Sequence, residues 1–221
     1  HPSSVPELMK LSQRVIAGNS YLVNYAKRWN SRVDYIPTPV DTSQWFPAAS
    51  RPVRSELTIG WIGSPTTAKY LHALQLVIEE LARTYPLRVT IVGAGRERLG
   101  WKCPLEQRPW SLTTEAAEFR ACDIGIYPLW DDEWSRGKCG FKALQFMASG
   151  VPVVASAVGM NCEIITDGAD GLLARTPEDW RRHLRRLLED PALRRQLGEA
   201  GRHTVEARYS LRAIAPRMVQ V

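Results

Sequence analysis

Cysteine is scarce in this 221-residue sequence, and long hydrophobic runs are absent. The cysteines stand far apart, with no Cys-x-x-Cys pair and no histidine at a metal-ligand spacing, which indicates reduced, packed thiols in a cytosolic protein and argues against a zinc site. They are Cys103, Cys122, Cys139 and Cys162. No apolar stretch approaches the roughly 20 residues of a membrane span, and the first residues form no signal peptide. We therefore expect a cytoplasmic protein, and the start at His1 without a methionine suggests a fragment.

Two common phosphate-binding signatures are also missing. No Gly-x-x-x-x-Gly-Lys-[Ser/Thr] motif occurs, and no Gly-x-Gly-x-x-Gly follows an expected strand, so neither a P-loop nor dinucleotide binding is favoured. Nothing resembles a Ser–His–Asp or Cys–His nucleophile. His72, His183 and His203 fall on expected helices, where they are interpreted as structural or surface residues.

The net charge of +6 comes largely from arginines between residues 175 and 217. Acidic residues lie among them in stretches of helical pattern, so a solvated helix face is the first interpretation. Contact with an anionic membrane, peripheral and at its inner face, is the second. Nucleic acid is a distant third, because basic and aromatic residues do not interleave as they do in nucleic-acid-binding modules. We expect no nucleic-acid partner.

A proline-rich stretch at residues 37–56 separates two parts of the chain and is the expected domain boundary. Before it we expect a helix from residue 7, a strand at 14–17, a helix at 20–29 and a strand at 33–36. After it we expect strands at 57–62, 87–92, 105–108, 123–127, 151–155 and 171–174. The expected helices are at 68–84, 115–121, about 141–148, 159–165, 177–189, 191–208 and from 211 to the end. Strands that alternate with helices predict an α/β fold with a doubly wound, parallel, Rossmann-like sheet.

In such a sheet, ligands bind outside the carboxyl ends of the strands. Loops that follow expected strand ends should therefore converge on one crevice. They begin at Gly63, Gly93, Pro128 and Ser156.

Three stretches at this crevice are informative. Residues 63–69 bring hydroxyls and Lys69 to a helix start, which fits either a phosphate contact or a plain N-cap. Residues 130–136 combine carboxylates, tryptophans and cations, which suits a polyhydroxylated ligand or an ordinary charged loop. In residues 159–165, Glu163 has two interpretations: contact with a substrate hydroxyl, or stabilisation of its own helix dipole.

Residues 137–156 carry a further phosphate-binding pattern. Glycines and Lys138 precede, and Lys142 begins, a helix whose N-terminus offers free N–H groups and the positive end of the helix dipole. The alternative is one more helix–strand unit of the core, with solvated lysines.

Seven strings together resemble the C-terminal portion of family 4 retaining glycosyltransferases with the GT-B fold. They are Val-Ile-Ala-Gly-Asn at 15–19, Ile-Pro-Thr-Pro-Val-Asp at 36–41, Gly-Trp-Ile-Gly-Ser-Pro-Thr-Thr at 60–67, Ile-Val-Gly-Ala-Gly at 91–95, Gly-Val-Pro-Val-Val-Ala-Ser at 150–156, Gly-Met-Asn-Cys-Glu-Ile-Ile at 159–165 and Asp-Gly-Ala-Asp-Gly-Leu-Leu-Ala at 167–174. They occur in the family's order. The resemblance implies that residues 1–39 end an acceptor-side domain that is otherwise missing. It further implies that residues 40–206 bind the nucleotide sugar and that residues 207–221 cross back to the first domain.

The resemblance also implies transfer of a sugar from a nucleotide-diphosphate-sugar donor, with retention of configuration and without a metal or other cofactor. Lys69 falls where the family has a phosphate-binding lysine. Ser64 falls where an arginine is common, and of Arg136, Lys138 and Lys142 we choose Lys138 to replace that cation. Lys69 and Lys138 are therefore the expected catalytic residues.

Two glutamates typical of the family are replaced, by Gly137 and Gln145. Gln145 is still able to bond ribose hydroxyls, and Asp131, Asp132 or Glu133 could substitute for the first glutamate. Trp110 stands where the family contacts the base. The residues expected to bind the donor are Gly63, Ser64, Trp110, Arg136, Lys142, Gln145, Asn161 and Glu163, with no metal ligand among them.

Two other functions stay open at this point. A sugar-nucleotide epimerase shares the architecture, but it would need histidine and acidic groups in crevice loops that here lack histidine. A non-catalytic nucleotide-sugar-binding module is compatible with the loss of both glutamates. By itself, the fragment is expected to bind donor without necessarily turning it over.

Overall fold

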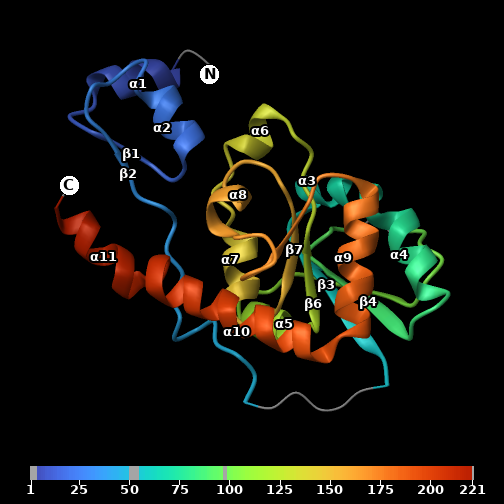
Figure 1. The fold of residues 1–221 in the computed structure, drawn as a ribbon. Coiled ribbons are helices and arrows are strands. Elements are labelled where there is room, and N and C mark those ends of the chain that lie inside the picture. The colour runs from blue at the N-terminus through green and yellow to red at the C-terminus, as the bar shows by residue number, and fades with distance from the viewer. Residues whose placement is uncertain (1–3, 50–54, 97–98, 221) are drawn as a thin grey trace.

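The computed structural model describes residues 4–49, 55–96 and 99–220, which hold a six-stranded sheet and a separate two-stranded sheet (Figure 1). The strands are β1 (Val15–Ala17), β2 (Val33–Tyr35), β3 (Leu57–Ile62), β4 (Leu87–Val92), β5 (Leu105–Arg108), β6 (Ile124–Tyr127), β7 (Val153–Ser156) and β8 (Leu172–Ala174). The α-helices are α1 (Ser4–Leu11), α2 (Ser20–Ala26), α3 (Pro65–Ala68), α4 (Gln75–Ala82), α5 (Glu115–Arg120), α6 (Glu133–Arg136), α7 (Phe141–Ala148), α8 (Asn161–Ile164), α9 (Pro177–Glu189), α10 (Pro191–Arg208) and α11 (Leu211–Val219), and η1 (Lys69–Leu74) is a 3₁₀-helix. Within the described ranges no helix is both long and apolar enough to cross a membrane.

The six-stranded sheet is entirely parallel, in the order β5-β4-β3-β6-β7-β8. The chain moves outward from β3 to β4 and β5, then returns to the other side of β3 with β6 and moves outward again. This order reverses between β3 and β6, as in doubly wound nucleotide-binding sheets. The predicted fold class is confirmed.

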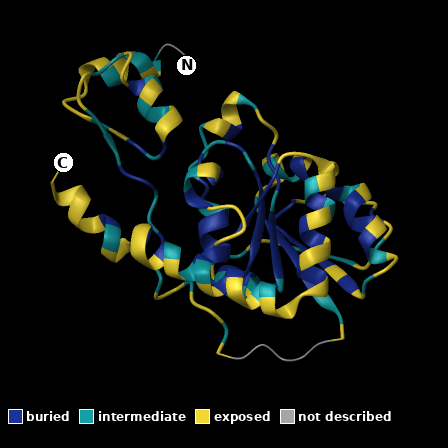
Figure 2. Cartoon of the chain, in the orientation of Figure 1, coloured by how far each residue is buried: buried dark blue, intermediate teal, exposed yellow. Residues whose placement is uncertain are grey.

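Helices cover both faces of the sheet because each strand sends apolar side chains to both sides. On one face, Ile59 and Ile91 belong to a core that includes buried residues of η1, α4 and α9. On the other face, Ile62 and Val92 belong to a core that includes residues of α5, α7 and α10. Figure 1 shows α7 and α8 on one side of the sheet and α4 and α9 on the other, and Figure 2 shows the strands between them as buried.

The N-terminal elements lie to one side of this sheet (Figure 1). β1 and β2 pair in parallel, and residues 36–49 lead to the main sheet with an isolated bridge between Val40 and Ser210. α11 reaches back to β2, where the Arg217 guanidinium donates to the Tyr35 carbonyl at 2.6 Å. The domain limits at residues 39/40 and 206/207 stay a prediction.

Two predicted elements are wrong. The single helix expected at 68–84 is three short helices that begin at Pro65, because proline fits the first helical position. η1 then places Leu71 and Leu74, three residues apart, together in the core. The loop expected up to Arg136 contains α6. Its N-cap is Asp132, whose carboxylate accepts a hydrogen bond from the Ser135 N–H at 2.7 Å.

The close contact of α10 with the turn before β7 yields a test of the packing. A Cβ atom on Gly198 would lie 2.3 Å from the Gly150 carbonyl oxygen, and backbone cannot turn aside as a side chain can. Although alanine favours a helix by about 1 kcal/mol over glycine, we expect Gly198→Ala to lose about 1–3 kcal/mol through overpacking. Thermal unfolding should show a lower Tm.

The matched control is Gly100→Ala, where an added Cβ meets nothing within 4 Å. It should change stability by less than about 0.5 kcal/mol. Equal Tm values for the two variants would contradict the described packing of α10.

Candidate functional site

A cavity of about 430 Å³ opens at the carboxyl ends of β3, β4, β5 and β6, where the strand order reverses. Its wall is built from the loops that follow these strands and from the start of α7. The lining residues are Trp61, Ile62, Gly63, Ser64, Pro65, Thr67, Tyr70, Gly93, Trp110, Glu115, Tyr127, Pro128, Leu129, Lys138 and Lys142. The position matches the crevice in which doubly wound sheets bind ligands.

The turn after β3 forms one wall and is fixed by its own hydroxyls. The Ser64 N–H donates to Thr67 Oγ1 at 3.0 Å, and the Ser64 hydroxyl lies 2.9 Å from that of Thr66. A Cβ on Gly63 would lie 2.3 Å from the Trp61 ring, so glycine lets the turn lie flat against this ring. Ser64 therefore both begins α3 and lines the cavity.

Two lysines lie near enough for their charges to interact, and one of them, Lys138, is part of the cavity wall. Lys138 lines it, with Nζ 5.5 Å from the ring centre of Trp134. Lys69 Nζ lies 5.2 Å from the ring centre of Trp130 and 5.3 Å from that of Tyr70. In the described part of the chain no carboxylate lies within ion-pair distance of either ammonium group.

Burial lowers the pKa of Lys138, the nearby carboxylate of Asp132 raises it, and the positive charge of Lys69 lowers it further. A neighbouring cation and partial desolvation both disfavour the charged lysine. An anion placed between the two ammonium groups would relieve both effects. The pair is thus suited to a multiply charged anion.

The acidic loop before Lys138 is largely committed to internal contacts. Asp132 caps α6, and hydrogen bonds from Ser135 are the main cause of its lowered pKa. Asp131 pairs with the Arg136 guanidinium at 2.7 Å. The Arg136 side chain is therefore occupied by a carboxylate, and it does not line the cavity.

Lys142 lines the cavity but its charge is compensated. Nζ lies 2.7 Å from Glu115 Oε1 and 2.9 Å from Gln145 Oε1, and 5.4 Å from the ring centre of Phe119. Glu115 is 6% exposed and Gln145 is fully buried. The Gln145 Nε2 finds no hydrogen-bond partner among the described residues. This wall therefore presents a neutral pair, in contrast to Lys138.

Trp110 provides an aromatic surface in the cavity wall. It lies in the turn after β5 and is 48% exposed, far more than an aromatic residue of the core. A Cβ on Gly93 would lie 3.2 Å from the Trp110 Cβ, so the turn after β4 supports the ring's position. A half-exposed ring beside a polar cavity can stack on a planar ligand.

Asn161 and Glu163 do not line the cavity. The buried Asn161 donates from Nδ2 to the Ser156 carbonyl at 2.9 Å, while its Oδ1 finds no partner in the described ranges. Glu163 accepts from the Ser20 N–H at 3.3 Å, from the Ser20 hydroxyl, and from the Tyr35 hydroxyl at 3.1 Å. Burial, and next the charge of Glu163, raise the pKa of Tyr35. Glu163 thus joins α8 to the N-terminal elements.

The structure therefore brings Gly63, Ser64, Trp110, Lys138 and Lys142 to one cavity, with Lys69 next to Lys138 and Gln145 behind Lys142. The sequence analysis missed Glu115, because its partner lies 27 residues away and no local pattern links them.

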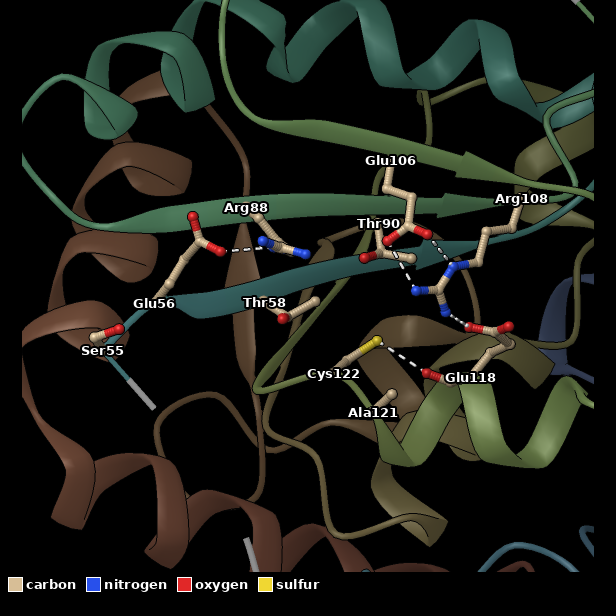
Figure 3. A pocket seen from close by; sticks show the side chains of 10 residues that line it. All are labelled: Ser55, Glu56, Thr58, Arg88, Thr90, Glu106, Arg108, Glu118, Ala121 and Cys122. Carbon is tan, nitrogen blue, oxygen red and sulfur yellow. Dashed lines mark hydrogen bonds and ion pairs between the residues drawn. The ribbon is translucent and has the colours of Figure 1, made fainter. Parts of the chain in front are cut away.

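A second and larger cavity, of about 500 Å³, lies over the face of β3, β4 and β5 beside α5 (Figure 3). None of the predicted site residues lines it. Its cations are paired: Arg88 with Glu56 at 2.6 Å, and Arg108 with Glu106 and Glu118 at 2.7–2.8 Å. This cavity is the larger one, but both of its arginines are paired with carboxylates and its lining carries more carboxylates than cations, so the smaller cavity is the better candidate for an anion.

In the described ranges the four cysteines form no disulfide, and no cluster of three or more histidine, cysteine or acidic side chains could hold a metal ion.

The family model of glycosyl transferases group 1 matches residues 56–190, well over half of the chain. The chain belongs to this family. The matched range contains the main sheet up to β8, and with it every residue of the candidate cavity. The family resemblance noted in the sequence is confirmed.

Curated relatives include two enzymes named D-inositol 3-phosphate glycosyltransferase. The chain is 26% identical to that of Segniliparus rotundus, over 88% of this chain and 49% of the relative. It is 29% identical to that of Nocardia farcinica, over 76% of this chain and 42% of the relative. The chain thus spans about half the length of the curated relatives it matches.

Solved structures of glycosyltransferases share the fold. Sucrose-phosphate synthase from Thermosynechococcus elongatus superimposes with a TM-score of 0.77 at 22% identity, over 99% of this chain and 59% of that one. The Anabaena protein HepE, solved with UDP and glucose, gives a TM-score of 0.81 at 16% identity, over 99% and 65% of the respective chains. At these identities the likeness concerns the fold.

The Lys142–Glu115 pair can be tested by its contribution to stability. Lys142→Met keeps an unbranched side chain at position 142 but removes the cation from the Glu115 carboxylate. The side chain of Glu115 alone is 8% exposed. We expect a loss of about 1–3 kcal/mol in urea unfolding, and a smaller loss when Glu115→Gln is added, since the uncompensated charge is then gone.

The exposed pair of Arg14 and Asp34 is the control, with side chains 40% and 32% exposed. Asp34→Asn should cost less than about 1 kcal/mol. If Lys142→Met is no more harmful than Asp34→Asn, or if Glu115→Gln worsens it additively, the pair is not the buried, coupled unit described.

Proposed function

We propose that this chain is the donor-binding part of a retaining glycosyltransferase, which moves a sugar from a nucleotide-diphosphate-sugar to an acceptor. One observation carries the proposal. In the described ranges Lys69 and Lys138 have no ion-pair partner, their charges lie near enough to interact, and Lys138 lines the same cavity as the half-exposed Trp110. A diphosphate next to a planar base has this combination of charge and surface.

The relatives and the shared fold support the choice of donor. The curated relatives are named as glycosyltransferases, and HepE was solved with UDP and glucose. The family membership concerns the region that contains the cavity. We extend from these proteins to this chain only the donor class, a sugar linked to a nucleoside diphosphate.

Lys69 and Lys138 have the catalytic role in this proposal. As the glycosidic bond to the diphosphate breaks, negative charge grows on the leaving group, and cations fixed in a partly buried site stabilise it. We propose that these ammonium groups, with the backbone N–H groups at the start of α7, supply this stabilisation without a metal ion. Retention of configuration is part of the same proposal, and the family resemblance supports it.

The remaining predicted residues have supporting roles in the proposal. Trp110 stacks on the base, Gly63 and Ser64 line the turn beside the phosphates, and Lys142 with Gln145 forms the wall next to the ribose. Arg136, Asn161 and Glu163 do not line the cavity, and contact between them and the donor stays a prediction.

A non-catalytic donor-binding module is the second candidate. Gly137 and Gln145 replace two carboxylates of the family, and Gln145 is neutral and fully buried. Turnover of the donor by the complete protein distinguishes an enzyme from such a module.

We further propose that the acceptor is held by an N-terminal domain to which residues 1–39 belong. A cytoplasmic location, with the arginine-rich helices α9 to α11 against an anionic membrane, is likewise a proposal from the sequence.

Calorimetric titration with UDP, GDP and ADP tests the donor class. At least one should bind saturably, and Lys138→Ala should weaken it by at least about tenfold, the equivalent of 1.4 kcal/mol. The matching nucleoside should bind Lys138→Ala almost as well as it binds the wild type, because it lacks the phosphates.

Lys10→Ala is the matched control, since Lys10 also lies over a tryptophan ring, at 4.9 Å from the centre of Trp29, but away from the cavity. It should leave both affinities unchanged. No saturable binding of any of the three nucleotides would refute the proposed function. Equal losses of nucleotide and nucleoside in Lys138→Ala would refute the role of this lysine.

A further inference from the structure

The loop that carries Lys138 is held by a residue from the distant N-terminal elements. Asn19, the N-cap of α2, is fully buried. Its Nδ2 donates to the carbonyl of Arg136 at 3.1 Å and to that of Lys138 at 2.9 Å, the two carbonyls on either side of Gly137. Its Oδ1 accepts from the Leu22 N–H at 2.7 Å. One amide thus caps a helix and bridges a loop 117–119 residues away.

The chemistry of these partners fixes the amide in one orientation. Carbonyl oxygens only accept hydrogen bonds, so the two loop carbonyls must face the NH₂ group. The Leu22 N–H only donates, so it must face the amide oxygen. All three contacts are lost or weakened if the side chain rotates, and buried polar groups left without partners are costly.

The same loop is confined on two sides by glycines. A Cβ on Gly18 would lie 2.5 Å from Cys139 Sγ, so the chain before Asn19 packs closely against the loop. On the other side, Gly159 has φ +51° and a Cβ there would lie 3.0 Å from Arg136 Cα. Residues 136–140 are therefore held between the N-terminal elements and the turn before α8.

This arrangement matters because Lys138 belongs to the held loop and lines the cavity. The position of an ammonium group determines how well it meets a charge that forms at one place, and small displacements are expensive. Asn19 does not line the cavity and therefore makes no direct contact with a ligand bound there. Any effect of Asn19 on a ligand would pass through the loop.

We propose that Asn19 is a positioning residue for the anion site, which fixes the loop 136–140 and thereby aims the ammonium group of Lys138 at the donor diphosphate. The inference rests on the proposed function. It makes diphosphate affinity depend on the N-terminal elements, which contribute no lining residue to the cavity.

Two variants separate this role from helix capping. Asn19→Asp and Asn19→Ser both keep an oxygen that can cap α2, since aspartate and serine are good N-caps. Neither can donate to both loop carbonyls: a carboxylate has no donor, and the serine hydroxyl is short and carries one.

Asn30 offers a matched control within the same elements. Its Nδ2 donates to the carbonyls of Met9 and Ser12, both at 2.8 Å, and its Oδ1 accepts from the Arg32 N–H at 2.7 Å. Asn30→Asp removes the same kind of bridge without contact to the loop 136–140.

The experiment titrates the wild type and the three variants with the nucleoside diphosphate that binds best among UDP, GDP and ADP, and with the matching nucleoside. We expect Asn19→Asp and Asn19→Ser to bind the diphosphate at least about tenfold more weakly than Asn30→Asp does, with nucleoside affinity within about twofold of the wild type. Thermal unfolding of each variant accompanies the titrations.

Three results would overturn the inference. Diphosphate binding in both Asn19 variants equal to that of Asn30→Asp would leave the proposed function intact and remove the role of Asn19. Parallel losses of diphosphate and nucleoside binding, with or without unfolding, would make Asn19 a structural residue only. Absence of nucleotide binding to the wild type would instead defeat the proposed function itself.

Discussion

The reversal of strand order between β3 and β6 is the constraint on which the candidate site depends. The helices that follow β3 pack on one face of the sheet, and α7, which follows β6, packs on the other. The loops at the carboxyl ends of these two neighbouring strands therefore diverge, and the space between them is the cavity that contains Gly63 on one side and Pro128 on the other. Buried apolar strands fix this geometry, and the polar residues of the cavity lie on the loops that the strands position.

The cations of the site differ in what surrounds them. Lys142 lies against Glu115 and Gln145, so its charge is largely compensated by neighbouring protein groups. Lys138 and Lys69 lie against aromatic rings, which stabilise a cation without neutralising it. The site is therefore neutral around Lys142 and positive around Lys138 and Lys69. A ligand with a diphosphate at one end and hydroxyls at the other matches that arrangement.

Much of the fold could be predicted from the sequence, because local patterns of residues determine most of its strands and turns. The apolar runs at β3, β4 and β7 and the glycine turns after them require only neighbouring residues to be recognised. The convergence of Gly63, Gly93 and Pro128 on one cavity followed from the rule that parallel strands end at one edge, whereas the assignment of Trp110 came from the family resemblance. By contrast, the broken helix from Pro65 and the short helix α6 depend on capping and core contacts that a hydrophobic pattern does not contain.

The two side-chain contacts that organise the site could not be predicted in this way. Glu115 with Lys142 and Asn19 with the loop 136–140 join residues that are far apart in the chain, so only the packed structure brings them together. Asn19 was predictable as a cap, since asparagine before a helix signals one. No sequence pattern predicts that the NH₂ group of the same amide donates to the loop.

A crystal structure with a bound nucleoside diphosphate tests the central claim most directly. The account predicts the diphosphate between the ammonium groups of Lys69 and Lys138, with the base against the ring of Trp110. A nucleotide bound in the larger cavity over β3, β4 and β5, or a diphosphate that contacts neither lysine, would contradict it.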